Sequence, residues 1–93
     1  MSFLHTLFQT IQDRKTNPKP GSYTTQLFSA GEDEIVKKVG EEAVEIILAT
    51  KGQGDGRVIE ESADLIYHLL VLLAHKGLTL DDVERELERR HKK

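Results

Sequence analysis

The stretch that decides the fold is residues 37–68, which reads KKVGEEAVE at 37–45 and RVIEESADLIYH at 57–68. An apolar run follows the first motif, and three glycines, at positions 52, 54 and 56, then separate the two halves. A phosphate-binding P-loop would need a preceding strand and a Gly-Lys-Ser/Thr ending, and neither is present. We therefore interpret the glycines as the turn of a helix hairpin.

Two carboxylate pairs stand out in these motifs, Glu42 with Glu45 and Glu61 with Asp64. The members of each pair are three residues apart, so on a helix they share one face. Like charges placed in this way repel unless something positive lies between them. The repetition of the pattern on two neighbouring helices therefore suggests a divalent cation.

The hairpin brings the two pairs to the same height. Glu45 lies about six residues before the turn and Glu61 about five residues after it, so both are about 8 to 9 Å from the turn at 1.5 Å of rise per residue. Carboxylates that converge beside an apolar seam are strongly destabilised without a counter-charge. Oxygen ligands suit a hard cation, Mg²⁺ or Mn²⁺.

Two other interpretations of the acids compete with this one. A di-iron bundle would use Glu-x-x-His on two helices, whereas His68 lies four residues after Asp64 and neither pair has a histidine at the third position. We interpret His68 as an interfacial packing residue rather than a ligand. The plainer alternative is that four of the acids are solvated helix surface: Glu41, Glu42, Glu60 and Glu61.

The whole chain reads as all-α, with four helices and no strand signal. Apolar periodicity predicts helices over about 3–14, 30–51, 57–76 and 80–91. Residues suited to capping a helix start precede three of the predicted helices. They are Ser2 for the first helix, Ser29 with Glu32 for the second, and Thr79 with Asp82 for the fourth. We expect three side chains of the last helix to point inward: Leu80, Val83 and Leu87.

The segment Thr16–Thr25 contains two prolines and a glycine and has no apolar periodicity, so we expect an extended loop. It is rich in hydrogen-bond donors. It is either an ordinary solvated connection or a substrate-binding loop.

The helix over 57–76 is apolar nearly all round, with leucine, isoleucine or valine at 65, 66 and 69–73. Such a helix is buried on all sides. A monomer with only four helices can hardly bury it, so we expect a homodimer with this helix at the interface.

Length and composition bound the function classes. The 93 residues predict one domain, 1–93, and the absence of cysteine is compatible with a reducing cytoplasm. A net charge of −3 argues against a nucleic-acid platform. We find no signal peptide, and the longest apolar run, Leu69–Ala74, is too short to span a membrane, so we expect neither a membrane partner nor secretion.

The pattern Glu41-Glu42-x-x-Glu45 followed by Glu61-x-x-Asp64 resembles the signature of the all-α, MazG-like nucleoside triphosphate pyrophosphohydrolases. The flanking motifs resemble one branch, the phosphoribosyl-ATP pyrophosphatases of histidine biosynthesis. The residues that carry the closer match are KKVGEE at 37–42, DLIYHLLVLL at 64–73, GSYT at 21–24 and GLTLDDV at 77–83.

The resemblance implies hydrolysis of phosphoribosyl-ATP to phosphoribosyl-AMP and pyrophosphate, with cleavage between the α and β phosphates. It also implies Mg²⁺, with Mn²⁺ as an alternative, and a helical homodimer. Some members carry a cyclohydrolase on the N-terminal side, for which we expect no room in 93 residues.

Roles follow for individual residues. We predict Glu42, Glu45, Glu61 and Asp64 as metal ligands, and Glu41 as an outer ligand or a residue that orients water. Lys38, one turn before Glu42, is the best candidate for a phosphate contact. The other candidate substrate contacts are basic and hydroxyl side chains, which phosphates require: Arg14, Lys15, Ser22, Tyr23 and Thr24.

Two alternatives remain open from the sequence. A housekeeping pyrophosphatase of ordinary or damaged nucleoside triphosphates would use the same acids. A non-catalytic helical dimerisation module would carry them as surface charge, and its melting temperature would not respond to metal.

Overall fold

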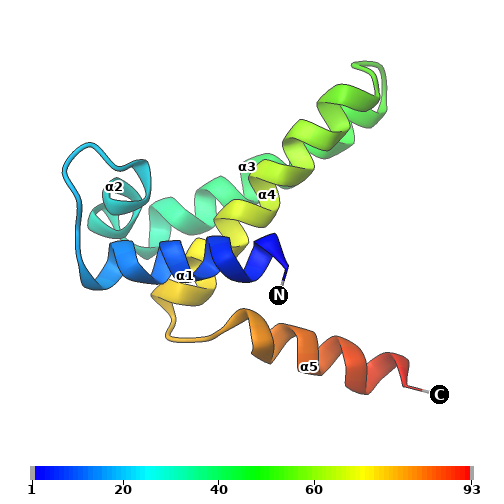
Figure 1. Cartoon of the computed structure of the whole chain (residues 1–93). Helices are drawn as coiled ribbons and strands as arrows, with labels where there is room; N and C mark the ends of the chain where they lie inside the picture. Colours follow the sequence, from blue (N-terminus) through cyan, green and yellow to red (C-terminus); the bar gives the residue numbers. More distant parts are fainter. Residues whose placement is uncertain (1, 93) are drawn as a thin grey trace.

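The computed structural model describes residues 2–92, which form five α-helices and no strand (Figure 1). In chain order they are α1 (Phe3–Thr16), α2 (Tyr23–Ala30), α3 (Glu32–Thr50), α4 (Asp55–His75) and α5 (Leu80–His91). The all-α prediction is confirmed, and the four expected helices begin and end within about two residues of their predicted bounds.

Helix α2 was not expected. The prediction of an extended loop over Thr16–Thr25 is wrong from Tyr23 onward, where the Ser22 hydroxyl accepts the Thr25 N–H at 3.2 Å and begins a helix. Tyrosine and threonine are weak helix formers, so the local sequence gives little signal. Packing supplies what propensity lacks, because Leu27 of this helix is 3% exposed and lies in the core.

The start of α3 also differs from the prediction. Ser29 and Glu32 do not form a capping box, and α3 instead follows Gly31, which has no side-chain cap. Gly31 has φ +98° and ψ −179°, a conformation that is essentially restricted to glycine. This residue turns the chain between α2 and α3.

The other two predicted caps are present. The Ser2 hydroxyl accepts the His5 N–H at 3.4 Å at the start of α1. At the start of α5, Thr79 and Asp82 form a full capping box, with each side chain bonded to the other's backbone N–H.

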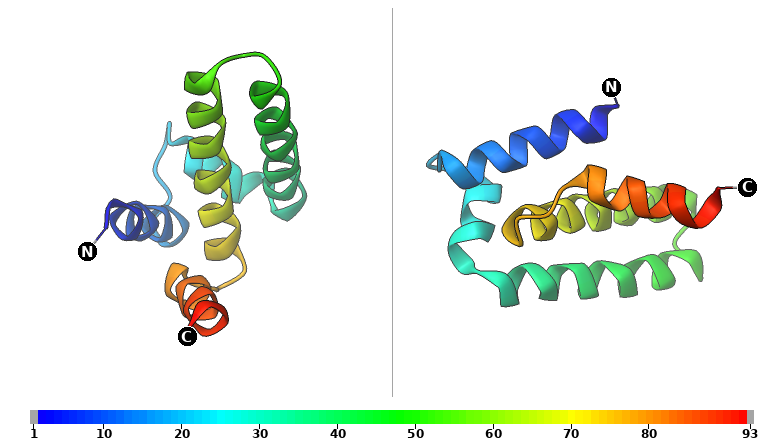
Figure 2. Two further views of the ribbon diagram at one scale, coloured as in Figure 1. Left: turned by 90° about the vertical axis from the view of Figure 1, so that its right-hand side faces the viewer. Right: turned by 90° about the horizontal axis from the view of Figure 1, so that it is seen from below.

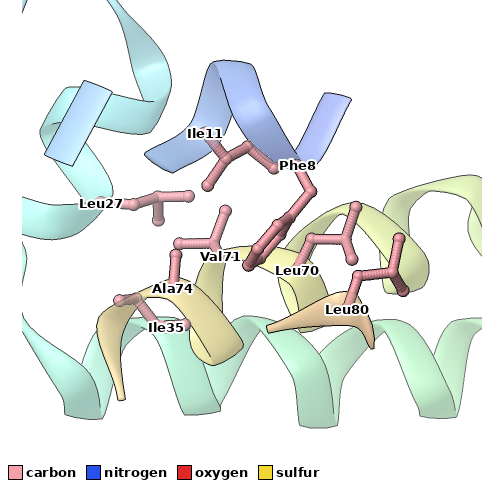
Figure 3. Packing of buried hydrophobic residues seen from close by; sticks show 8 residues of the cluster. All are labelled: Phe8, Ile11, Leu27, Ile35, Leu70, Val71, Ala74 and Leu80. Carbon is pink, nitrogen blue, oxygen red and sulfur yellow. The ribbon is translucent and has the colours of Figure 1, made fainter. Parts of the chain in front are cut away.

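All five helices contribute to one hydrophobic core (Figure 3). The buried members are Phe8, Ile11, Leu27, Ile35, Leu70, Val71, Ala74 and Leu80. The α3 member lies in the first turn of that helix and the α4 members lie in its last turns, so the core contains the unconnected ends of the α3–α4 hairpin.

The rest of the hairpin projects beyond the other helices. Helices α3 and α4 run antiparallel and side by side (Figure 2), and their connected ends extend away from α1, α2 and α5 (Figure 1). The radius of gyration is 14.4 Å, against about 12 Å for a compact chain of this length. The acid motifs lie on this projecting arm.

Several apolar side chains predicted to be buried are exposed within the chain. Ile66 and Leu69 of α4 are 41% and 40% exposed, so α4 is not buried on all sides. Leu80 points into the core as predicted, but Val83 and Leu87 are 39% and 53% exposed. Helix α5 turns by 109° from α4, so only its first turn reaches the core.

None of the individual helices in residues 2–92 has the length and apolar character needed to cross a membrane. By length and composition alone, the bent pair of α4 and α5 could do so together.

His5 ties α1 to α5. Its Nε2 lies 2.9 Å from Asp81 Oδ1 and 3.1 Å from Glu84 Oε1, and its Nδ1 lies 2.9 Å from the Ser2 hydroxyl. The hydrogen bond to Asp81, together with the charges of both carboxylates, raises the pKa of His5 above its ordinary value of 6.5.

We expect this contact to make stability depend on pH. Because the folded-state pKa is raised, the stabilisation is fully present below pH 6.5 and is lost as the pH rises through the folded-state pKa. The variant His5→Gln should therefore melt below the wild type at acidic pH and approach it at pH 8 to 9. Thermal melts across this range check the prediction, and an offset that does not change with pH would contradict it.

Candidate metal and nucleotide site

Acidic side chains from α3 and α4 share one pocket on the projecting hairpin. Its volume is about 400 Å³, and it is lined by Glu41, Glu42, Val44, Glu45 and Glu61. Three of the four predicted metal ligands therefore lie together, as their positions on either side of the turn predict. Asp64 does not line the pocket, but its charge is close enough to raise the pKa of Glu42.

Glu42 has a buried oxygen at the pocket. The atom is Oε1, and it lies 2.5 Å from His68 Nδ1. Burial raises the pKa of Glu42, and the charges of Asp64 and Glu61 act in the same direction, while His68 opposes them. A buried carboxylate oxygen with one imidazole neighbour keeps a lone pair that a bound cation would use.

Glu61 is 7% exposed and has a positive partner on its own helix. The Arg57 Nη2 donates to Glu61 Oε2 at 2.5 Å, and the Arg57 Nη1 donates to Glu60 Oε1 at 2.5 Å. No role for Arg57 was predicted from the sequence. Its position four residues before Glu61 was the available signal, because such residues are neighbours on a helix surface.

His68 is buried inside the chain rather than at an exposed interface, with 5% of its surface exposed. The Tyr23 hydroxyl donates to His68 Nε2 at 3.0 Å, and the Tyr67 ring packs edge-on at 5.0 Å between ring centres. His68 therefore packs within its own chain and not at an interface as predicted, and its polar contacts with α2 and with Glu42 were not anticipated.

The four predicted ligands do not form a tight cluster. In residues 2–92, the group of three ligand-type side chains whose atoms lie within 4.8 Å of one another is His5, Asp81 and Glu84. Like charges repel. The carboxylate of Glu42 also contacts His68, whereas that of Glu61 contacts Arg57, and this keeps the two carboxylates from converging. The metal-ligand assignment therefore remains a prediction.

The predicted basic contacts have partners within the chain. Lys38 Nζ lies 3.9 Å from Glu41 Oε1, at the edge of the acidic pocket. Arg14 pairs with Asp13 at 2.8 Å. Lys15 donates to the carbonyl oxygens of Ala74 and His75 at 2.8 and 3.3 Å, so its ammonium group binds the C-terminal end of α4.

The predicted hydroxyl contacts also have partners. Ser22 caps α2, and the Tyr23 hydroxyl binds His68. The Thr24 hydroxyl shares a hydrogen bond with that of Tyr67 on α4. Tyr23 and Thr24 therefore fasten the start of α2 to α4, next to the acids.

Comparison with known proteins places the chain in a family. The family model described as phosphoribosyl-ATP pyrophosphohydrolase matches residues 4–91. The chain belongs to this family. The match spans all five helices and confirms the family that the sequence motifs indicated.

Relatives of the pyrophosphohydrolase include stand-alone and bifunctional proteins. The chain is 52% identical to a phosphoribosyl-ATP pyrophosphatase of Limosilactobacillus fermentum, over 97% of this chain and 85% of the relative. It is 47% identical to the enzyme of the same name from Lactiplantibacillus plantarum, over 100% of this chain and 88% of the relative. It is also 50% identical over its full length to the histidine biosynthesis bifunctional protein HisIE of Caldanaerobacter subterraneus subsp. tengcongensis, of which it spans 45%.

Family membership confirms the predicted enzyme class. The chain is a phosphoribosyl-ATP pyrophosphohydrolase of histidine biosynthesis, a hydrolase built only from helices in the part that the structure describes. The acidic pocket on α3 and α4 is its candidate active site.

Proposed function

We propose that the pyrophosphohydrolase cleaves phosphoribosyl-ATP between the α and β phosphates by using Mg²⁺, or Mn²⁺ in its place, in the α3–α4 pocket. The ligands would be Glu42, Glu45, Glu61 and Asp64. The observation that carries the proposal is that three of these acids line one pocket, in which a Glu42 oxygen is buried beside His68.

Acidic and basic residues of the chain would take different roles in the site. An acidic pocket repels a triphosphate unless positive charge intervenes. A bound divalent ion neutralises charge on phosphate oxygens and lowers the pKa of bound water. Glu41, 55% exposed at the rim, is placed to hold or orient a water molecule, and Lys38 beside it is placed to contact a phosphate.

We propose different roles for the remaining candidate substrate contacts. Arg14 remains a candidate phosphate contact because its pairing with Asp13 is exposed to solvent and weak. Lys15, Tyr23 and Thr24 would shape the site instead, since their polar atoms hold α1 and α2 against α4. Ser22 would contribute by capping α2.

The assay that tests this function measures pyrophosphate release from phosphoribosyl-ATP, and separately from ATP, dCTP and dUTP, with Mg²⁺ and with EDTA. We expect turnover of phosphoribosyl-ATP only, abolished by EDTA. Turnover of the common triphosphates would move the chain to the housekeeping class. No turnover, with no metal effect on melting, would leave a dimerisation module.

We also propose that the chain is a homodimer. Its projecting hairpin leaves Ile66 and Leu69 of α4 exposed, and α5 adds Val83 and Leu87 beside a groove of about 350 Å³. Contiguous exposed apolar surface marks interaction sites. A second copy packed on these helices would bury it and would complete the burial of α4 that its composition indicates.

Replacement of Leu69 by glutamate should convert this dimer to a monomer, because it places a charge in the apolar contact. Leu4→Glu is the matched control, since Leu4 is 37% exposed but lies on α1. Sedimentation equilibrium at micromolar concentrations measures the outcome. A monomeric wild type, or a Leu69→Glu variant that remains dimeric, would contradict the proposed interface.

The remaining proposals follow from the sequence. Residues 1–93 would act as one cytoplasmic domain that takes a small nucleotide and binds neither nucleic acid nor membrane, in keeping with a net charge of −3.

A further inference from the structure

We infer that His68 is a positioning residue for the metal site, which fixes the Glu42 carboxylate, and that Tyr23 fixes His68 in turn. This inference rests on the proposed metal ligands. It concerns groups from three helices: Tyr23 begins α2, Glu42 lies in the middle of α3, and His68 lies on α4.

The hydrogen bonds of His68 assign both ring nitrogens. Nδ1 donates to the backbone carbonyl oxygen of Asp64 at 2.9 Å, so its proton is on Nδ1. Nε2 therefore carries a lone pair and accepts from the Tyr23 hydroxyl at 3.0 Å. A rotation of the ring would break both bonds, and a switch of tautomer would lose the bond to Asp64.

Packing prevents the ring from moving aside. His68 is 5% exposed, and the Tyr67 and Tyr23 rings meet it edge-on with centre-to-centre distances of 5.0 and 5.9 Å. The imidazole is therefore held in a fixed position beside Glu42.

This ring sets the position of Glu42 Oε1. The oxygen lies 2.5 Å from Nδ1, and the hydrogen bond from His68 acts to lower the pKa of Glu42, so the imidazole binds this oxygen directly. A carboxylate oxygen has a second lone pair, which stays available for a cation. The same ring contacts the side chain of one predicted ligand and the backbone of another, so it also sets the spacing of α3 and α4 at this level.

Tyr23 extends this contact to α2, through a hydrogen bond between residues 45 positions apart. Tyr67 offers a natural comparison. It stacks on Tyr23 at 6.2 Å and its hydroxyl also links α2 to α4, but its partner is Thr24 and not the His68–Glu42 pair. If Tyr23 acts through His68, the two hydroxyls differ in their effect on metal binding, although both join the same two helices.

The first test compares Tyr23→Phe with Tyr67→Phe by titrating each protein with Mn²⁺ in the absence of substrate and following free Mn²⁺ by electron paramagnetic resonance. Loss of a group that orients a metal ligand typically weakens metal affinity about 10- to 100-fold. We expect Tyr23→Phe to raise the Mn²⁺ Kd about tenfold, at the low end of this range, and Tyr67→Phe to leave it unchanged. Equal effects of the two variants would overturn the inference.

The second test varies His68 itself. His68→Asn keeps a donor near the position of Nδ1, whereas His68→Gln places its amide nearer to Nε2. We expect His68→Gln to raise both the Mn²⁺ Kd and the Mg²⁺ concentration for half-maximal activity, and His68→Asn to restore most of the affinity. Variants that only melt at a lower temperature, with unchanged metal affinity, would show a merely structural role and overturn the inference.

A failure of this inference can be distinguished from a failure of the proposed function. A wild-type protein that binds no Mn²⁺ and turns over without Mg²⁺ would refute the metal site, and the inference with it. A wild type that depends on the metal, with variants that all bind it equally, would refute only the positioning role.

Discussion

Glu42→Gln is expected to lower kcat/KM for phosphoribosyl-ATP at least about a hundredfold. A metal ion contributes several kcal/mol to stabilising charge in the transition state, and each 1.4 kcal/mol corresponds to about a tenfold change in rate. Glu42 provides a buried oxygen at the pocket, so its loss should weaken metal binding more than the loss of an exposed acid would. Steady-state pyrophosphate release over a range of Mg²⁺ concentrations measures the effect.

The fold should survive this change. The substitution Glu42→Gln removes a carboxylate whose pKa is raised by burial, so the metal-free variant should melt no lower than the wild type. Glu88→Gln is the matched control, because Glu88 is an exposed acid on α5 outside the pocket. Near-normal, Mg²⁺-dependent turnover by Glu42→Gln would make the ligand assignment wrong.

Ile35→Ala is expected to cause the largest loss of stability. Ile35 is fully buried at the root of α3, where the core joins all five helices. Truncation of a buried isoleucine to alanine costs about 2 to 5 kcal/mol, a large part of the total stability of a small domain. The melting temperature should fall by roughly 10 to 30 °C for a chain of this size.

Ile59→Ala provides the comparison for this prediction. Ile59 lies on α4 and is 70% exposed, so the same truncation removes little buried surface. Thermal unfolding followed by circular dichroism should separate the two variants by well over about 5 °C. Similar melting temperatures of the two variants would mean that the core formed by the five helices does not stabilise the α3–α4 hairpin.

Sequence patterns predicted much of this fold, because these patterns depend only on residues that are close together along the chain. The spacing of apolar residues located α1, α3, α4 and α5, and the capping residues Ser2 and Thr79 marked two of their starts. The acid pairs could be placed in one pocket because both lie at similar distances from the same turn. Each of these inferences needs only helical geometry.

The features that the sequence did not reveal depend on contacts between distant segments. Helix α2 begins with weak helix formers, and the burial of Leu27 stabilises it. The bond from Tyr23 to His68 joins residues 45 positions apart, and no periodicity reports such a contact. Val83 and Leu87 were expected to point inward because a single sequence does not show whether a helix face meets its own chain or another copy.

The central claim is that the α3–α4 pocket holds the catalytic metal. Anomalous diffraction from crystals that contain Mn²⁺ tests it most directly. We predict a peak within ligand distance of the carboxylates of Glu42, Glu45, Glu61 and Asp64. A peak only at the group formed by His5, Asp81 and Glu84, or no peak on α3 and α4 in crystals of an active enzyme, would contradict it.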